Sequence, residues 1–212
     1  AAIALRNYGH IVHIFTSHHA NDHCFEETDQ RKPNALPVWV VGDFLPTKIF
    51  GRFAIICAML RGIWLSLWLL WNWTLYNPLI RRNRVTPQST ANEKLVGGYD
   101  VVITDQLSIY NVLLTFTSAR TIFYCHFPDL LLSKPEKSSF LQTIKSIYRF
   151  PINFLEQLST GMSEMVLVNS NFTSQIFAQT FSLLHYRNVI PTVLYPSIAM
   201  DSYDSNEEYD TY

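Results

Sequence analysis

Residues 101–125 read VVITDQLSIYNVLLTFTSARTIFYC, and this stretch decides the fold class. The apolar runs VVITD and TIFYC each predict a strand, and QLSIYNVLLTFTSA between them predicts a helix. Two strands joined through a helix at this spacing form a βαβ unit, in which the strands lie parallel. Because both runs are apolar almost throughout, we expect the sheet to be covered on both faces.

The same alternation extends to both sides of this unit. Further strands are predicted at residues 10–16, PVWVV, MVLVNS and TVLYP. A long apolar helix is predicted over residues 50–76. Residues 140–159 predict one or two helices, with Pro151 opening the second, and Ser170 is predicted to cap a helix in NFTSQIFAQTFSLL.

This order of elements predicts an α/β protein with a Rossmann-like, doubly wound parallel sheet over residues 1–197. The acidic segment 198–212 is predicted to be a linker or tail. The opening AAIALRNYGH predicts the end of a helix that stops at Gly9. Since the chain does not begin with Met, we expect it to be a fragment or an incomplete gene product.

Composition narrows the class of protein. With 212 residues, 48% of them hydrophobic, the chain has enough apolar material for a large core and does not resemble a disordered protein. A formal net charge of −1 does not suggest a nucleic-acid partner. Cys24, Cys57 and Cys125 lack metal-ligand spacing, and so sparse a set is typical of a reducing compartment.

Polar side chains follow the predicted strands, and in open parallel sheets ligands bind at the carboxyl ends of strands. The candidate substrate-binding or catalytic residues selected on this ground are Asp43, Asp105, Gln106, His126, Asp129, Asn169 and Ser170.

His126 is the leading candidate, because it stands between the strand TIFYC and the rigid Phe127-Pro128 step. An imidazole there can hydrogen-bond a sugar hydroxyl or a phosphate oxygen, and the alternative is a partly buried structural histidine. For Asp43, the alternative to a binding role is that it only forms a turn. For the Asn169-Ser170 pair, the alternative is that it only caps a helix. His18, His19, His23 and Asp22 match no tight metal-site spacing, so we expect no metal.

The tryptophan-rich stretch GIWLSLWLLWNWTLY, residues 62–76, is apolar around most of its circumference. As a helix it is roughly 22 Å long, which is less than the ~30 Å hydrocarbon core of a bilayer. Extending it back to Phe53 places Arg61 near its middle, which costs roughly 3 kcal/mol in a membrane. Three placements are open: at the membrane interface, buried against the sheet or a partner, or across the bilayer.

Interfacial placement predicts that one face of this helix contacts lipid. Its residues are Trp64, Leu67, Trp68, Trp71 and Leu75. The basic residues Arg81, Arg82 and Arg84 would then meet anionic lipid.

Several motifs fall in an order that resembles one enzyme family. They are HCFEET (23–28), GDFLP (42–46), DQLS (105–108), FYCHFPDLLL (123–132), YRFPINFLEQLSTGMSE (148–164), LVNSNFT (167–173) and VLYPS (193–197). Together they are similar to the N-terminal half of the α-1,3/α-1,6-mannosyltransferases of the dolichol pathway, which are GT-B enzymes of the glycosyltransferase family 4 type. FYCHFPDLLL is long and unusual, and it is the most specific of these motifs.

The resemblance implies a domain that faces a second Rossmann-like domain across a cleft. It implies GDP-mannose as donor, a dolichol-diphosphate-linked oligosaccharide as acceptor in N-glycan assembly, and a place at the cytosolic face of the endoplasmic reticulum membrane. It also implies retention at the anomeric carbon without a metal or other cofactor. By resemblance His126 lies beside the donor sugar, and Asp105 has a role toward the acceptor.

The resemblance further implies that two parts of the family's enzyme are missing here. Its glycine-rich GGAER loop would precede Ala1, and its donor-binding domain would follow this chain. We therefore expect the chain alone to lack transferase activity. Two rival functions remain open: another membrane-bound GT-B transferase, and a non-catalytic module derived from one that binds membranes or partners.

Overall fold

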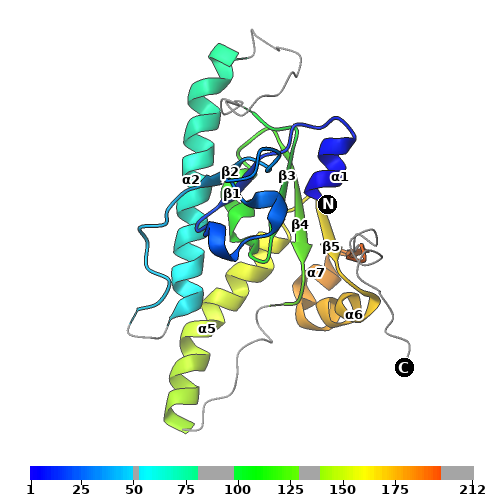
Figure 1. Cartoon of the computed structure of the whole chain (residues 1–212). Helices are drawn as coiled ribbons and strands as arrows, with labels where there is room; N and C mark the ends of the chain where they lie inside the picture. Colours follow the sequence, from blue (N-terminus) through cyan, green and yellow to red (C-terminus); the bar gives the residue numbers. More distant parts are fainter. Residues whose placement is uncertain (50–52, 81–97, 129–138, 197–212) are drawn as a thin grey trace, which may run out of the picture.

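The computed structural model describes residues 1–49, 53–80, 98–128 and 139–196, with side chains described except at 74–80, 139–146 and 148 (Figure 1). Four strands form one parallel sheet in the order β3 (Val101–Asp105), β4 (Arg120–Cys125), β5 (Met165–Val168), β6 (Thr192–Val193). A second parallel pair joins β1 (Ile14–Thr16) to β2 (Val38–Val40). The predicted parallel α/β architecture is confirmed, although the strands lie in two sheets rather than one ladder.

The helices connect successive strands, as the βαβ pattern requires. The longer ones are α2 (Ala54–Ile80), α5 (Ser139–Thr160) and α6 (Asn171–Thr180), and the shorter ones are α1 (Ala2–Asn7), α3 (Asn111–Leu114) and α7 (Ser182–Tyr186). Single 3₁₀ turns occur at η1 (Asn21–His23), η2 (Glu26–Thr28) and η3 (Ser108–Tyr110). In Figure 1, α2 and the amino-terminal part of α5 extend beyond the sheets along one side of the molecule.

Two hydrophobic clusters hold the layers together. In the first, Phe177, Phe181 and Leu184 of the α6–α7 region pack on the buried residues Phe123 and Val168 of the four-stranded sheet. In the second, Leu65 and Leu69 of α2 pack with Val41 after β2 and with Leu114 of α3, and Phe15 and Val102 lie against them. The second cluster therefore joins the two sheets to the long helix.

The helix predicted after β3 is much shorter than expected. Only η3 and α3 form there, and the hydroxyls of Thr115 and Thr117 donate hydrogen bonds to the backbone carbonyls of Val112 and Leu114 where the helix ends. Asn111, which is fully buried, fixes this short segment by accepting a hydrogen bond from Thr104 Oγ1 at 2.9 Å.

Two other boundaries differ from the sequence predictions. The strand predicted over residues 10–16 is shorter in the structure, because only the residues of β1 pair with β2. Pro151 lies inside α5 rather than opening a second helix. The carbonyl that loses its partner there belongs to Ile147, a residue exposed to solvent, so water can satisfy it.

Candidate functional site at the strand ends

His126 and Asp105 meet at the carboxyl ends of neighbouring strands. Asp105 is the last residue of β3 and His126 follows the last residue of β4, and in the register Asp105 lies opposite Tyr124. His126 Nε2 lies 2.8 Å from Asp105 Oδ1, and the two side chains are 50% and 59% exposed. The expectation that these two residues share one rim is confirmed.

The contact fixes how the imidazole of His126 presents itself. A carboxylate only accepts hydrogen bonds, so Nε2 carries the proton donated to Asp105 and Nδ1 is left for a ligand. The ring also packs edge-on against Tyr124, with the ring centroids 4.8 Å apart. An imidazole held in this way can accept a hydrogen bond from a sugar hydroxyl when neutral and donate one when protonated.

Gln106 directly follows this pair and has an unusual backbone conformation. Its φ of 64° is in the left-handed region, which non-glycine residues adopt only where the surroundings hold them. The turn is closed by the amide of Leu107, which donates to the carbonyl oxygen of Asp105 at 2.8 Å. The sharp turn after β3 thus keeps Asp105 at the rim.

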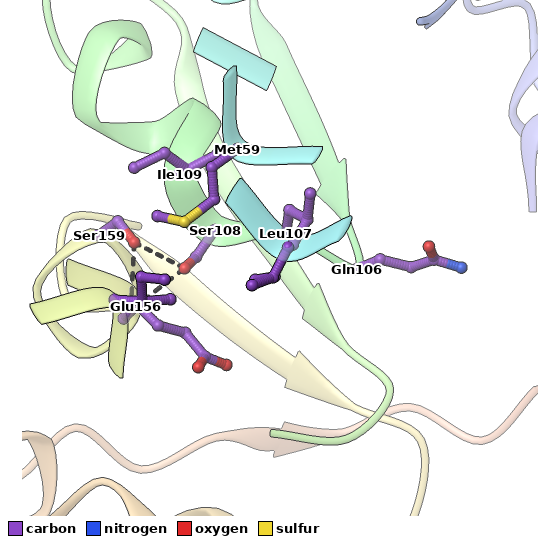
Figure 2. Close-up of a pocket in the computed structure, with 9 residues that line it drawn as sticks. Met59, Gln106, Leu107, Ser108, Ile109, Glu156 and Ser159 are labelled. Carbon is purple, nitrogen blue, oxygen red and sulfur yellow. Dashed lines mark hydrogen bonds between the residues drawn. The ribbon is translucent and has the colours of Figure 1, made fainter. Parts of the chain in front are cut away.

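A small pocket that is partly open to solvent lies beside Gln106, between α2, η3 and α5 (Figure 2). Its lining is largely apolar, with Ile55, Met59, Leu107, Ile109 and Ile152, and the hydroxyls of Ser108 and Ser159 hydrogen-bond each other at 2.7 Å. Figure 2 shows the side chain of Gln106 extending away from the other labelled residues. Sequence reasoning did not find this pocket, since its walls come from three separate segments.

Asn169 and Ser170 follow β5, and Cys125 before His126 is paired with Val168 before Asn169. The cap predicted at Ser170 is confirmed, because its Oγ accepts from the amide of Thr173 at 3.1 Å. Asn169 Oδ1 accepts from Thr173 Oγ1 at 2.5 Å. Both side chains therefore serve the start of α6, and their predicted role toward substrate stays a prediction.

Asp43, which follows β2, belongs to a second polar cluster. Its Oδ1 contacts His18 Nδ1 at 2.8 Å and Arg61 Nη2 at 3.3 Å, and Arg61 also donates to the carbonyl oxygen of Ser17 at 2.6 Å. The hydrogen bond from His18, aided by the charge of Arg61, lowers the pKa of Asp43. Arg61 was not among the predicted site residues, and its position inside an apolar helix was the available signal.

Tyr110 of η3 feels the charge of one residue from each cluster. Burial raises its pKa, and the charges of Arg61 and Asp105 act on it in opposite directions. Both charged groups therefore lie within electrostatic range of the same phenol. Asp129, the remaining predicted site residue, lies outside the described residues.

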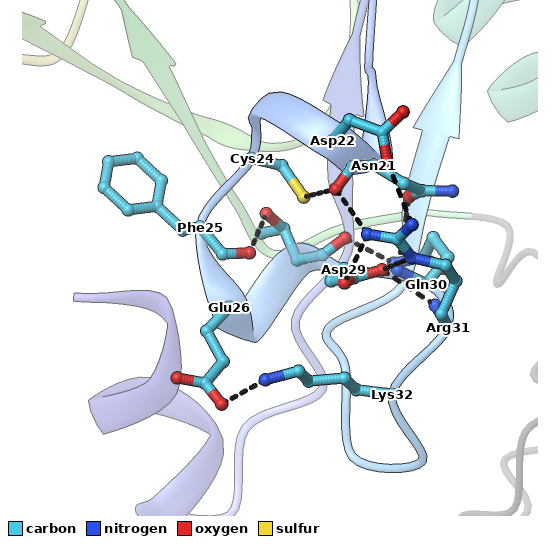
Figure 3. A network of polar contacts seen from close by, with 10 residues as sticks. Asn21, Asp22, Cys24, Phe25, Glu26, Asp29, Gln30, Arg31 and Lys32 are labelled. Carbon is cyan, nitrogen blue, oxygen red and sulfur yellow. Dashed lines mark hydrogen bonds and ion pairs between the residues drawn. The ribbon is translucent and has the colours of Figure 1, made fainter.

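Hydrogen bonds and ion pairs among its own side chains hold together the polar loop after β1 (Figure 3). Arg31 bonds to Asp29 and Asp22 at 2.9 Å each, and its hydrogen bond to Asp29 lowers the pKa of that carboxyl group. Lys32 pairs with Glu26. Within the described ranges, no group of three or more His, Cys, Asp or Glu side chains is arranged to hold a metal ion.

The apolar helix α2 has one face in the core and one face in solvent. Cys57, Arg61, Leu65, Leu69 and Trp73 are buried. Leu60, Trp64, Leu67 and Trp71 are exposed along the other face, with Trp71 67% exposed. The residues 54–73 are long and apolar enough to cross a membrane by length and composition.

The prediction of which residues of α2 face outward is thus partly wrong. Trp64, Leu67 and Trp71 do face outward, but Trp68 packs toward the core, with its ring centroid 6.2 Å from that of Phe15. The side chain of Leu75 and the residues Arg81, Arg82 and Arg84 lie outside the described part of the chain.

Comparison with known proteins shows what the chain is similar to. It is 41% identical to an alpha-1,3/1,6-mannosyltransferase ALG2 from Rhizomucor pusillus over 96% of its own length and 38% of the relative's. The proteins of that name from Saccharomyces cerevisiae and Homo sapiens are 39% and 38% identical over 95% and 97% of the chain. By sequence the chain is related to part of the proteins named alpha-1,3/1,6-mannosyltransferase.

The chain spans about two fifths of the length of these mannosyltransferases, with 34% of the yeast and 42% of the human protein covered. No family model and no solved structure matches it. The identities with these mannosyltransferases confirm the resemblance inferred from FYCHFPDLLL and the other motifs.

Proposed function

We propose that residues 1–197 form the acceptor-side domain of a mannosyltransferase that transfers mannose from GDP-mannose to a dolichol-diphosphate-linked oligosaccharide. The observation that carries the proposal is the contact of His126 with Asp105 at the carboxyl ends of β4 and β3, in a chain whose relatives are named mannosyltransferases. The reaction would retain the anomeric configuration, at the cytosolic face of the endoplasmic reticulum membrane, in N-glycan precursor assembly. It would need no cofactor.

In this reaction the chain's residues would act chiefly by positioning. Asp105 holds the imidazole of His126, and the Nδ1 atom of His126 would hydrogen-bond a hydroxyl of the donor mannose. Fixing that sugar while the diphosphate departs lowers the barrier through orientation and electrostatic stabilisation. Donor-phosphate contacts would come from outside this chain, so the chain alone would be inactive.

The membrane part of the proposal is supported by the exposed face of α2. Indole rings favour the headgroup boundary, and the indole of Trp71 faces outward on this side of the helix. Arg61 points into the protein and bonds there, so its charge does not oppose contact of the opposite face with lipid. The helix would lie along the membrane surface with its buried face on the domain.

The test is His126→Ala in the complete enzyme that contains this chain. We expect turnover to fall by about ten-fold or more, since one well-placed polar contact is worth roughly 1.5–3 kcal/mol. Phe116→Ala is the control, because Phe116 is exposed and lies between α3 and β4, at the opposite ends of the strands. Unchanged turnover for His126→Ala would contradict the catalytic role of His126.

A further inference from the structure

Arg61 occupies a position that a purely structural helix would fill with an apolar residue. It is 6% exposed in the middle of α2, and its Nη2 bonds to the Ser17 carbonyl and to Asp43, while Nε is buried without a hydrogen-bond partner. A buried charge is costly even when paired, and well-packed apolar residues often stabilise as much. The presence of Arg61 is therefore better explained by the groups that it holds in place than by a contribution to the stability of the fold.

Arg61 holds the carboxylate of Asp43 with one oxygen engaged and one oxygen outward. His18 and Arg61 both contact Oδ1, and the side chain of Asp43 is 54% exposed. Asp43 is ionised at neutral pH like an ordinary carboxyl group, and its lowered pKa extends the ionised form to lower pH. An oriented carboxylate beside an imidazole presents a strong acceptor and a second polar group to the same ligand.

An aromatic surface adjoins this carboxylate. Phe44 follows Asp43 directly and is 73% exposed, and its ring centroid lies 5.5 Å from that of Trp64 in an edge-on arrangement. Trp64 follows Arg61 by three residues on α2, so the two side chains are neighbours along the helix. Gly42 has a φ of +92°, and a Cβ there would come within 2.9 Å of Trp64 Cδ1.

We infer that Asp43, His18, Phe44 and Trp64 form a saccharide subsite that binds a pyranose ring of the acceptor. The C–H face of a pyranose packs against aromatic rings, and its hydroxyls donate to a carboxylate and pair with an imidazole. Arg61 is the positioning residue of this subsite. The inference rests on the proposed function, which identifies the ligand as the acceptor sugar. What it adds is the position of that sugar on the domain.

The experiment uses the whole 212-residue chain and methyl α-D-mannoside as probe, with affinity measured by NMR titration. We expect the mannoside to shift the amide signals of Gly42–Leu45 and the indole signal of Trp64. Phe44→Ala should weaken binding at least about five-fold, and Asp43→Asn comparably, since aromatic packing and the carboxylate each supply a large share of so small an interface. Phe116→Ala, a phenylalanine of equal 73% exposure, should leave the affinity unchanged.

The outcomes separate this inference from its rivals. No shift at residues 42–45, or equal binding by Phe44→Ala and the parent chain, overturns it, whatever His126→Ala does to turnover. If Phe44→Ala weakens flotation with lipid vesicles but leaves mannoside affinity intact, the aromatic pair is a membrane contact and the inference is wrong. If the shifts appear but His126→Ala leaves turnover unchanged, the subsite stands and the proposed catalytic role fails.

Discussion

Asp105 and His126 form a side-chain contact that is too exposed to matter much for folding. Pairs at this exposure contribute about 0–1 kcal/mol. Asp105→Asn should therefore change the free energy of unfolding by less than about 0.5 kcal/mol, measured by urea titration. In the complete enzyme it should lower turnover several-fold, because His126 loses the carboxylate that fixes its tautomer.

Asp105→Glu keeps the carboxylate and serves as the comparison for Asp105→Asn. It should recover part of the lost turnover if orientation of His126 is the reason for the loss. Equal loss for both variants would show that Asp105 acts through its own contact with substrate, and not by holding His126.

The three cysteines differ in their access to solvent, and their reactivity should follow. Cys57 and Cys125 are buried, whereas Cys24 is partly exposed. Burial raises the pKa of Cys125 to about 12, so almost no thiolate exists at neutral pH. Iodoacetamide at pH 7.5 should label Cys24 alone in the folded chain and all three cysteines in urea, as read by peptide mass spectrometry. Labelling of native Cys125 at the rate of Cys24 would show that the thiol is reactive and not an inward strand residue.

At the scale of elements, the contact of α2 with η3 depends on Gly62. A Cβ at this position would lie 2.9 Å from Cγ2 of the buried Ile109 and 3.2 Å from Cε1 of Tyr110. Overpacking typically costs about 1–3 kcal/mol, which exceeds the roughly 1 kcal/mol by which alanine favours a helix over glycine. Gly62→Ala should therefore lower the free energy of unfolding by about 1 kcal/mol in urea titrations.

A matched change on the other face of the same helix checks this interpretation. Leu67→Ala removes an exposed side chain, and it should alter stability by less than about 0.5 kcal/mol. A gain in stability for Gly62→Ala would mean that η3 moves aside without cost, and that the close approach does not hold the rim in place.

At the scale of the whole molecule, the exposed face of α2 should govern attachment to membranes. Vesicles containing anionic lipid should carry the parent chain in flotation, because burying apolar surface contributes about 25 cal/mol per Å². Leu67→Glu combined with Trp71→Glu should abolish flotation while the chain stays folded, since both side chains are already in solvent. A double variant that floats as well as the parent would exclude α2 as the anchor.

The control for this experiment replaces a tryptophan that faces inward. Trp68→Glu should destabilise the domain, because Trp68 packs against Phe15 and the second hydrophobic cluster. Circular dichroism separates the two effects: the outward pair changes membrane binding with folding intact, and the inward residue changes folding itself.

Much of the fold could be predicted from the sequence, because the signals are local. Apolar runs such as VVITD and TIFYC marked β3 and β4, and the Ser170 cap marked the start of α6. The shared edge of the strand ends also followed, since parallel strands joined through helices place their carboxyl ends on one side. That reasoning brought Asp105 and His126 to one rim, and it depended on nothing beyond the chain order.

The tertiary structure alone decided which side of α2 faces the protein. The helix is apolar all round, so no periodic pattern in the sequence distinguishes Trp68, which packs inward, from Trp64 and Trp71, which face solvent. Only the packed structure could show that Arg61 turns inward to Asp43, because that contact joins residues distant in sequence. Local propensity sets which kind of element forms, whereas its exact bounds and the direction of its side chains depend on which neighbours are available to pair with it and bury it.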